Sequence, residues 1–222
     1  MHFMHLLKSL DDLIYELMTW LVFYPVTFWR TITRPSKMMV YSDAELADRE
    51  DRQYPDTLTP PLFLLVTLLL SHGIELAVIG QSSIVADDKG LAGLISDDTS
   101  LLILRLVIFS IFPLIMALRL VHKKRWKLTR DTLKAPFYAQ CYPAGPFALV
   151  MGLGAMATQL QWDWTKVAGL ALMIAAMLWY GILQSRWFAQ ELGVSFLKGF
   201  WVASVGMVEC VAVICLVAPL IA

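Results

Sequence analysis

The stretch Pro61–Gly80 reads PLFLLVTLLLSHGIELAVIG and contains one carboxylate and no lysine or arginine. A helix that crosses the hydrocarbon core of a bilayer needs about 20 mostly apolar residues. This stretch meets that requirement, and four others do so as well: Leu101–Val121, Phe137–Thr158, Val167–Ser185 and Gly199–Ile221. The sequence therefore predicts an all-α fold, a polytopic membrane bundle of about five transmembrane helices.

The composition agrees with this prediction. Of the 222 residues, 58% are hydrophobic and only 16% are charged, which is too apolar for an ordinary soluble domain. The charged residues gather between the apolar stretches. The formal net charge is zero, so the chain as a whole has no electrostatic attraction to nucleic acid.

The first 59 residues are expected to form a cytoplasmic or interfacial region, followed by the transmembrane domain at 60–222. Leu13–Trp29 is apolar but contains Glu16 and Pro25, so it either spans the membrane or lies along its surface as an amphipathic helix. We favour the interfacial alternative. Further on, Ser42 and Glu45 have the spacing of a capping box, which predicts a short helix that starts there.

The charges of the connections predict the orientation. Lysine and arginine are retained on the cytoplasmic side of a membrane. The second connection, 122–136, is strongly basic, whereas the first, 81–100, is mostly acidic. Five spans then place the N-terminus in the cytoplasm and the C-terminus outside. Such a basic connection is also expected to contact anionic lipid head groups. The residues expected to do so are Lys123, Lys124, Arg125, Lys127 and Arg130.

Four ionisable residues fall inside the predicted spans, where charge is costly and often functional: His72, Glu75, Arg105 and Glu209. Glu75 and Arg105 have similar depths, so an ion pair between them is expected, either structural or part of a transport path. His72 and Glu209 lie near mid-span. They contact each other or water, or Glu209 is protonated and packed.

These residues do not indicate an enzyme. Ser71 and His72 are adjacent, and adjacent helical residues point about 100° apart, so they form no nucleophile–base pair. His72 and Glu75 share a helix face, but two ligands do not make a metal site. The chain has no CxxC or HExxH motif. We expect no catalytic residue, metal or cofactor.

Small residues recur at four-residue spacing in two of the predicted spans. Such spacing lets neighbouring helices approach closely in a membrane, so these residues are expected to lie at helix–helix contacts. The residues are Ala144, Ala148 and Gly152 in the third span, and Ala171 and Ala175 in the fourth.

The organisation resembles the Ypt-interacting-protein family, whose prokaryotic members are often labelled permeases. Three local features carry the resemblance. They are the stretch from Tyr24-Pro25 to Arg34-Pro35, the start Thr59-Pro60-Pro61 of the first span, and Tyr138 to Tyr142-Pro143 at the third. The resemblance implies an all-helical membrane fold and oligomerisation, and no known chemistry.

Two function classes follow. The first is a permease- or channel-like protein whose path is lined by the four intramembrane ionisable residues. The second is a non-transporting membrane organiser or accessory subunit of a membrane complex. In both classes the expected partners are membrane lipids, together with a second copy of this chain or another subunit of a membrane complex.

The orientation is testable by chemical labelling in a background without the native cysteines. Asp87→Cys should react with an impermeant thiol reagent added to intact cells, because the first connection is expected outside. Lys124→Cys should not react until the cells are permeabilised. The reverse pattern would contradict both the orientation and the number of spans.

Overall fold

The computed structural model describes residues 2–79 and 98–217, without the side chains of 2–10, 12, 13, 51, 98–105 and 217. These ranges are helical almost throughout and contain no strand. The helices are α1 (His2–Thr33), α2 (Pro35–Leu46), the 3-10 helix η1 (Glu50–Arg52), α3 (Pro60–Ile79), α4 (Asp98–Lys123), α5 (Arg130–Gln159), α6 (Asp163–Leu192) and α7 (Phe196–Val217).

The predicted all-α fold is confirmed, and five of the described helices are long and apolar enough to cross a membrane. These are α3 to α7, and each contains most of one predicted span. The end of the last predicted span, after Val217, lies outside the described residues. The helices α5 and α6 have 30 residues each and exceed the length that a bilayer core requires.

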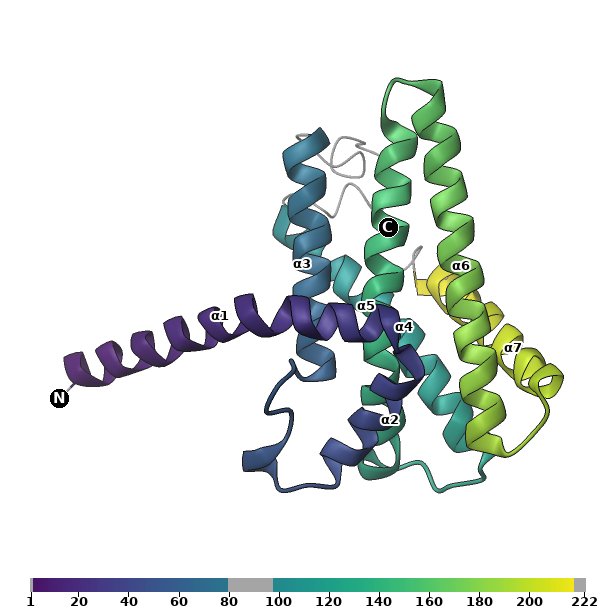
Figure 1. Ribbon diagram of the computed structural model, residues 1–222, viewed down its shortest axis with the longest axis horizontal. Helices are drawn as coiled ribbons and strands as arrows, with labels where there is room; N and C mark the ends of the chain where they lie inside the picture. The colour runs from purple at the N-terminus through teal and green to yellow at the C-terminus, as the bar shows by residue number, and fades with distance from the viewer. Residues whose placement is uncertain (1, 80–97, 218–222) are drawn as a thin grey trace.

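The helix α5 is the centre of the bundle. It packs on α3, α4 and α6, and α7 packs on α6 and α4. Figure 1 shows α1 crossing the bundle at a steep angle to α5, with its N-terminal half projecting beyond it. The helix α1 is not among the candidate spans. The interfacial position of Leu13–Trp29 stays a prediction.

The corner between α1 and α3 is fixed by hydrogen bonds to one residue. The amide of Leu58 donates to Thr27 Oγ1 (3.0 Å), and its carbonyl accepts from the Tyr142 hydroxyl (3.0 Å). The rings of Tyr24 and Tyr142 both pack on the ring of Phe63, with centroids 5.5 and 5.8 Å from it. The N-terminal region is therefore packed against the bundle.

The predicted helix start at Ser42 is wrong. The helix α2 begins at Pro35, whose fixed φ suits the first position of a helix. Ser42 is buried inside α2, and Glu45 Oε2 accepts the amide of Tyr54 (2.5 Å). The capping-box spacing of Ser42 and Glu45 therefore has no capping role, because Glu45 binds the backbone at Tyr54, in the segment that follows α2.

One set of small residues packs as predicted. Ala144 and Ala148 are buried against Leu64 and Leu68 of α3. A Cβ on Gly152 would lie 2.5 Å from Ser71 Oγ, so α3 and α5 approach closely there. The prediction for this face of α5 is confirmed.

The prediction for Ala171 and Ala175 is wrong, since both are exposed. The close contact of α5 with α6 is made instead by Gly154 and Gly169. A Cβ on Gly169 would lie 2.5 Å from the Gly154 carbonyl oxygen. A carbonyl cannot move aside without deforming its helix, so only glycine fits at this crossing.

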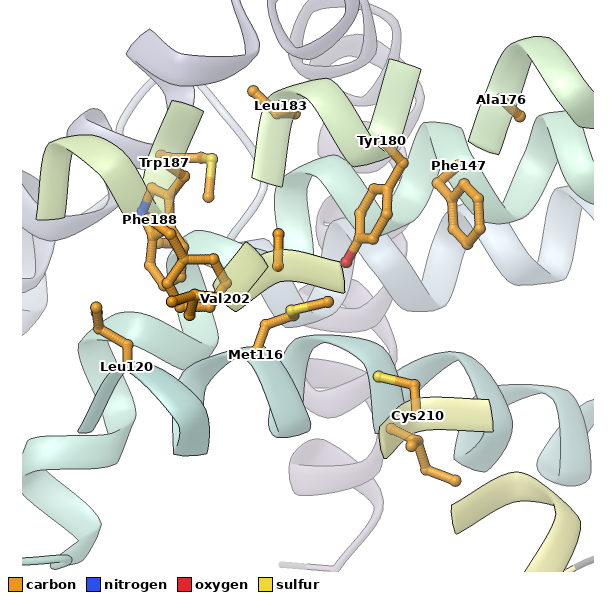
Figure 2. Packing of buried hydrophobic residues seen from close by; sticks show 14 residues of the cluster. Met116, Leu120, Phe147, Ala176, Tyr180, Leu183, Trp187, Phe188, Val202 and Cys210 are labelled. Carbon is orange, nitrogen blue, oxygen red and sulfur yellow. The ribbon is translucent and has the colours of Figure 1, made fainter. Parts of the chain in front are cut away.

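The largest apolar cluster lies where α4, α5, α6 and α7 meet (Figure 2). The rings of Phe147 and Tyr180 stack with centroids 4.5 Å apart and an interplanar angle of 22°. Trp187 and Phe188 pack edge to face at 4.9 Å, beside Val202 of α7. These contacts attach α7, the last described helix, to the bundle.

Replacing Gly169 by alanine should lower the melting temperature of the detergent-solubilised protein, because the added methyl group would meet the Gly154 carbonyl. Overpacking of this kind costs about 1–3 kcal/mol. Gly181→Ala in the same helix is the matched control, since a Cβ there meets nothing within 4 Å. Equal melting temperatures for the two variants would contradict the close crossing.

Candidate functional site

The polar residues of α3 share one buried face of that helix. The relative solvent exposure of Ser71, His72 and Glu75 is 8%, 7% and 7%. They continue the stripe of Leu64 and Leu68, because residues three and four apart lie on the same side of a helix. The stripe is apolar near Pro60 and becomes polar towards Ile79. The packing of α3 on α5 therefore carries these polar groups into the bundle.

His72 is the least satisfied polar side chain of this face. Neither Nδ1 nor Nε2 has a hydrogen-bond partner among the described residues. A buried polar group without a partner costs about 1–3 kcal/mol, and buried polar groups are almost always paired. Both ring nitrogens are therefore available to a ligand or a water molecule.

The expected ion pair between Glu75 and Arg105 stays a prediction. Glu75 is buried on α3, one turn from His72. Arg105 belongs to α4, but its side chain lies outside the described residues.

Glu209 lies elsewhere and has a different partner from those expected. Arg119 Nη1 donates to Glu209 Oε1 (2.5 Å), and Arg119 Nε donates to the Val202 carbonyl (2.7 Å). The ion pair joins α4 to α7, whereas His72 faces α5 from α3. The expected contact between His72 and Glu209 is therefore not formed.

The chain makes room for this ion pair at Gly206. A Cβ there would lie 2.9 Å from Met116 Sδ and 3.2 Å from Arg119 Cδ. The side chain of Arg119 is 12% exposed and that of Glu209 46%. Arg119 was not among the residues for which the sequence predicted a role. The sequence signal was its position one turn before Lys123, inside an apolar run.

A second buried polar contact was also missed by the sequence analysis. Gln140 of α5 and Gln184 of α6 exchange amide hydrogen bonds of 2.9 and 2.6 Å, and neither is exposed. Each side-chain amide donates one hydrogen bond to the other, so the pair fixes the register of two helices. The only sequence signal was a glutamine in each of two apolar stretches.

The basic residues expected at lipid head groups differ in their surroundings. Lys124 Nζ donates to Glu191 Oε2 of α6 (2.6 Å) and lies 4.6 Å from the centroid of the Trp126 ring. Lys123 lines a hollow beside α7, and Arg130 lines another beside Tyr138. Lys124 is therefore engaged within the protein.

Asp43 of α2 adds a second carboxyl group near Lys124 and Glu191. Partial burial at this junction, together with the negative charge of Glu191, raises the pKa of Asp43 to about 6, while Lys124 acts in the opposite direction. Asp43 is exposed on its outer side. The ion pair of Lys124 and Glu191 therefore joins α4 to α6, and Asp43 of α2 lies within the field of both charges.

The described side chains offer no metal centre. No three His, Cys, Asp or Glu side chains within 2–79 and 98–217 are grouped to hold an ion. Comparison of the chain with family models, curated proteins and solved structures finds no match. Function is therefore inferred from the buried polar residues and the basic surfaces.

The ion pair of Arg119 and Glu209 should show coupling in a double-mutant cycle with Arg119→Leu and Glu209→Leu. Each single change leaves a charge in apolar surroundings, and the double change removes both, so we expect a coupling of about 1–3 kcal/mol in the free energy of unfolding.

The pair of Lys166 and Asp163 is the matched control. It spans 3.2 Å with side chains 50% and 97% exposed, so its coupling should stay below about 0.5 kcal/mol. Additive effects of the Arg119 and Glu209 changes would show that this contact contributes nothing to stability.

Proposed function

We propose that this integral membrane protein is permease- or channel-like and moves a proton or small cation along the interface of α3 and α5. His72 is the central residue of the path, and Glu75 is its second ionisable group. Arg105 stays a proposed member on the strength of its sequence depth. Glu209 is left out, because it is engaged with Arg119 between α4 and α7.

The observation that carries this proposal is the state of His72. Its ring is 7% exposed, and both nitrogens lack a hydrogen-bond partner among the described residues. A structural histidine would be expected to donate at least one hydrogen bond. Histidine changes charge near neutral pH, and Glu75 lies one turn away on the same face. Together they form the kind of pair that a proton or cation path requires.

The proposed path involves no enzymatic step, metal or cofactor. The proposed orientation places α2 and the basic connection in the cytoplasm, with membership of the Ypt-interacting-protein family as the proposed lineage. Five candidate spans after an N-terminal helix packed at Leu58 support that lineage.

A membrane-organising role is the second candidate, and the exposed surface of α1 favours it. Leu21 and Val22 in the middle of this helix are 69% and 61% exposed, as are several neighbouring apolar side chains. Trp20, Phe23 and Tyr24 of the same stretch pack on the bundle, so Leu21 and Val22 lie on the outward face of α1. A surface of this kind can embed in a membrane interface or bind an apolar partner.

Flux measurements on proteoliposomes separate the two candidates. The wild-type protein should pass protons or a monovalent cation, and His72→Gln should reduce that flux about tenfold or more, because glutamine keeps the polarity but cannot titrate. Glu75→Gln should act in the same direction.

Glu209→Gln is the matched control, because it removes an intramembrane carboxylate that lies outside the proposed path. It should leave the flux within about twofold of wild type in protein that reconstitutes equally well. No flux in the wild-type protein, or equal flux in the His72 variant, would contradict the proposal and favour the organising role.

A further inference from the structure

Three basic side chains surround one cavity where the corner of α1 and α2 meets α6. The cavity has a volume of about 330 Å³, and Arg34, Lys37 and Arg186 line it together with Thr33 and Ser36. Within the described parts of the chain, none of the three cations has an ion-pair or hydrogen-bond partner for its side chain. The positive charge of this cavity is therefore uncompensated.

The first turn of α2 opens on the same cavity. Ser36 and Lys37 are the second and third residues of this helix, and the residue before it, Arg34, provides no side-chain cap. Amide groups in the first turn have no partner within their own helix and carry a partial positive charge. They add to the attraction that the three side chains exert on an anion.

An apolar groove adjoins this basic cavity. It has a volume of about 230 Å³ and is lined by Ile32, Pro146, Val150 and Ala175, among others, with almost no polar surface. Trp179 lines both spaces. The indole thus joins an apolar groove to a basic cavity, a place in which tryptophan commonly lies at membrane interfaces.

We propose that this composite surface binds one anionic phospholipid. The phosphate lies among Arg34, Lys37 and Arg186, and an acyl chain follows the groove past Trp179 towards Val150 and Ala175. Along α6 the rise from Arg186 to Ala175 is about 16 Å, which suits a head group and the first half of an acyl chain.

The apolar groove distinguishes a lipid from a soluble anion. A free phosphate would use the three cations but would leave the groove empty of any partner. A lipid would fill both spaces, because its charged head group and its acyl chain are adjacent, as the cavity and the groove are. Both spaces lie where α1 crosses the bundle (Figure 1). The site is independent of the path at His72, which lies between α3 and α5.

The loop cations are a poorer site for a bound lipid. Lys124 is engaged by Glu191, and Asp131 shares the hollow that Arg130 lines. These residues can still attract a charged surface without holding one molecule. The cavity of Arg34, Lys37 and Arg186 combines three unpaired cations with an apolar extension, so it provides a defined place for a single lipid.

Native mass spectrometry of the full-length detergent-solubilised protein tests the proposal. Phosphatidylglycerol should be retained about tenfold or more over phosphatidylcholine with the same acyl chains, because each basic residue adds attraction to an anionic head group. The triple variant Arg34→Gln, Lys37→Gln, Arg186→Gln should lose this preference. Ala175→Phe, which fills the groove, should reduce retention of both lipids.

The matched control is the triple variant Arg52→Gln, Lys134→Gln, Lys198→Gln, which removes three exposed cations at the same end of the bundle. It should keep the preference. If the first triple variant does not fold, Lys37→Gln and Arg186→Gln as single changes give the same comparison with smaller losses.

Three results would overturn the proposal. One is equal retention of the two lipids by the wild-type protein, and another is an unchanged preference in the variants at the three cations. The third is displacement of phosphatidylglycerol by an equal concentration of inorganic phosphate, which would assign the cavity to a soluble anion. A failure of flux in liposomes would leave this comparison unaffected.

Discussion

The close approach of α5 to its two neighbours is the constraint on which the rest of the structure depends. In a membrane, helices gain little from the hydrophobic effect and associate through packing and hydrogen bonds. Gly152 lies against Ser71 of α3, and Gly154 lies against Gly169 of α6. Within one turn, α5 therefore fixes the position of a helix on each side.

The placement of the polar residues follows from this packing. The stripe of α3 that meets α5 begins with apolar side chains and ends with His72 and Glu75, so close packing buries two ionisable groups. On the other side of α5, Gln140 pairs with Gln184. The bundle thus contains two glutamines that bond to each other on one side and a histidine without a described partner on the other. That difference is the physical basis for placing function at α3.

The ion pair of Arg119 and Glu209 shows a different use of charge in the same environment. Arg119 reaches across Gly206 to bind both the Val202 carbonyl and Glu209. Two of its donors bind α7, so the charge holds α7 to α4. Intramembrane charge in this chain therefore has two roles, one structural at α7 and one proposed for conduction at α3.

The helices could be predicted from the sequence, because about 20 apolar residues in succession have one stable state in a bilayer. The contact of Ala144, Ala148 and Gly152 was also predictable, since their spacing defines one helix face. The partner of Glu209 was not, because depth along a helix does not say which neighbour it faces. Ala171 and Ala175 were mispredicted for the same reason. The spacing of small residues indicates a face on which a helix could pack, but it does not say whether another helix lies there. The start of α2 at Pro35 was missed because the prediction relied on the capping-box spacing of Ser42 and Glu45. Proline at the first position of a helix was the better signal.

Water access to His72 is the most direct test of the central claim. Water-edited solid-state NMR of the protein in bilayers, with the ring signal assigned by its loss in His72→Gln, measures whether magnetisation passes from water to the imidazole. If water enters a path between α3 and α5, transfer to His72 should be well above that to Phe63, a fully buried residue of the same helix. Equal, negligible transfer to both rings would show that water does not reach His72 and would contradict a path between α3 and α5.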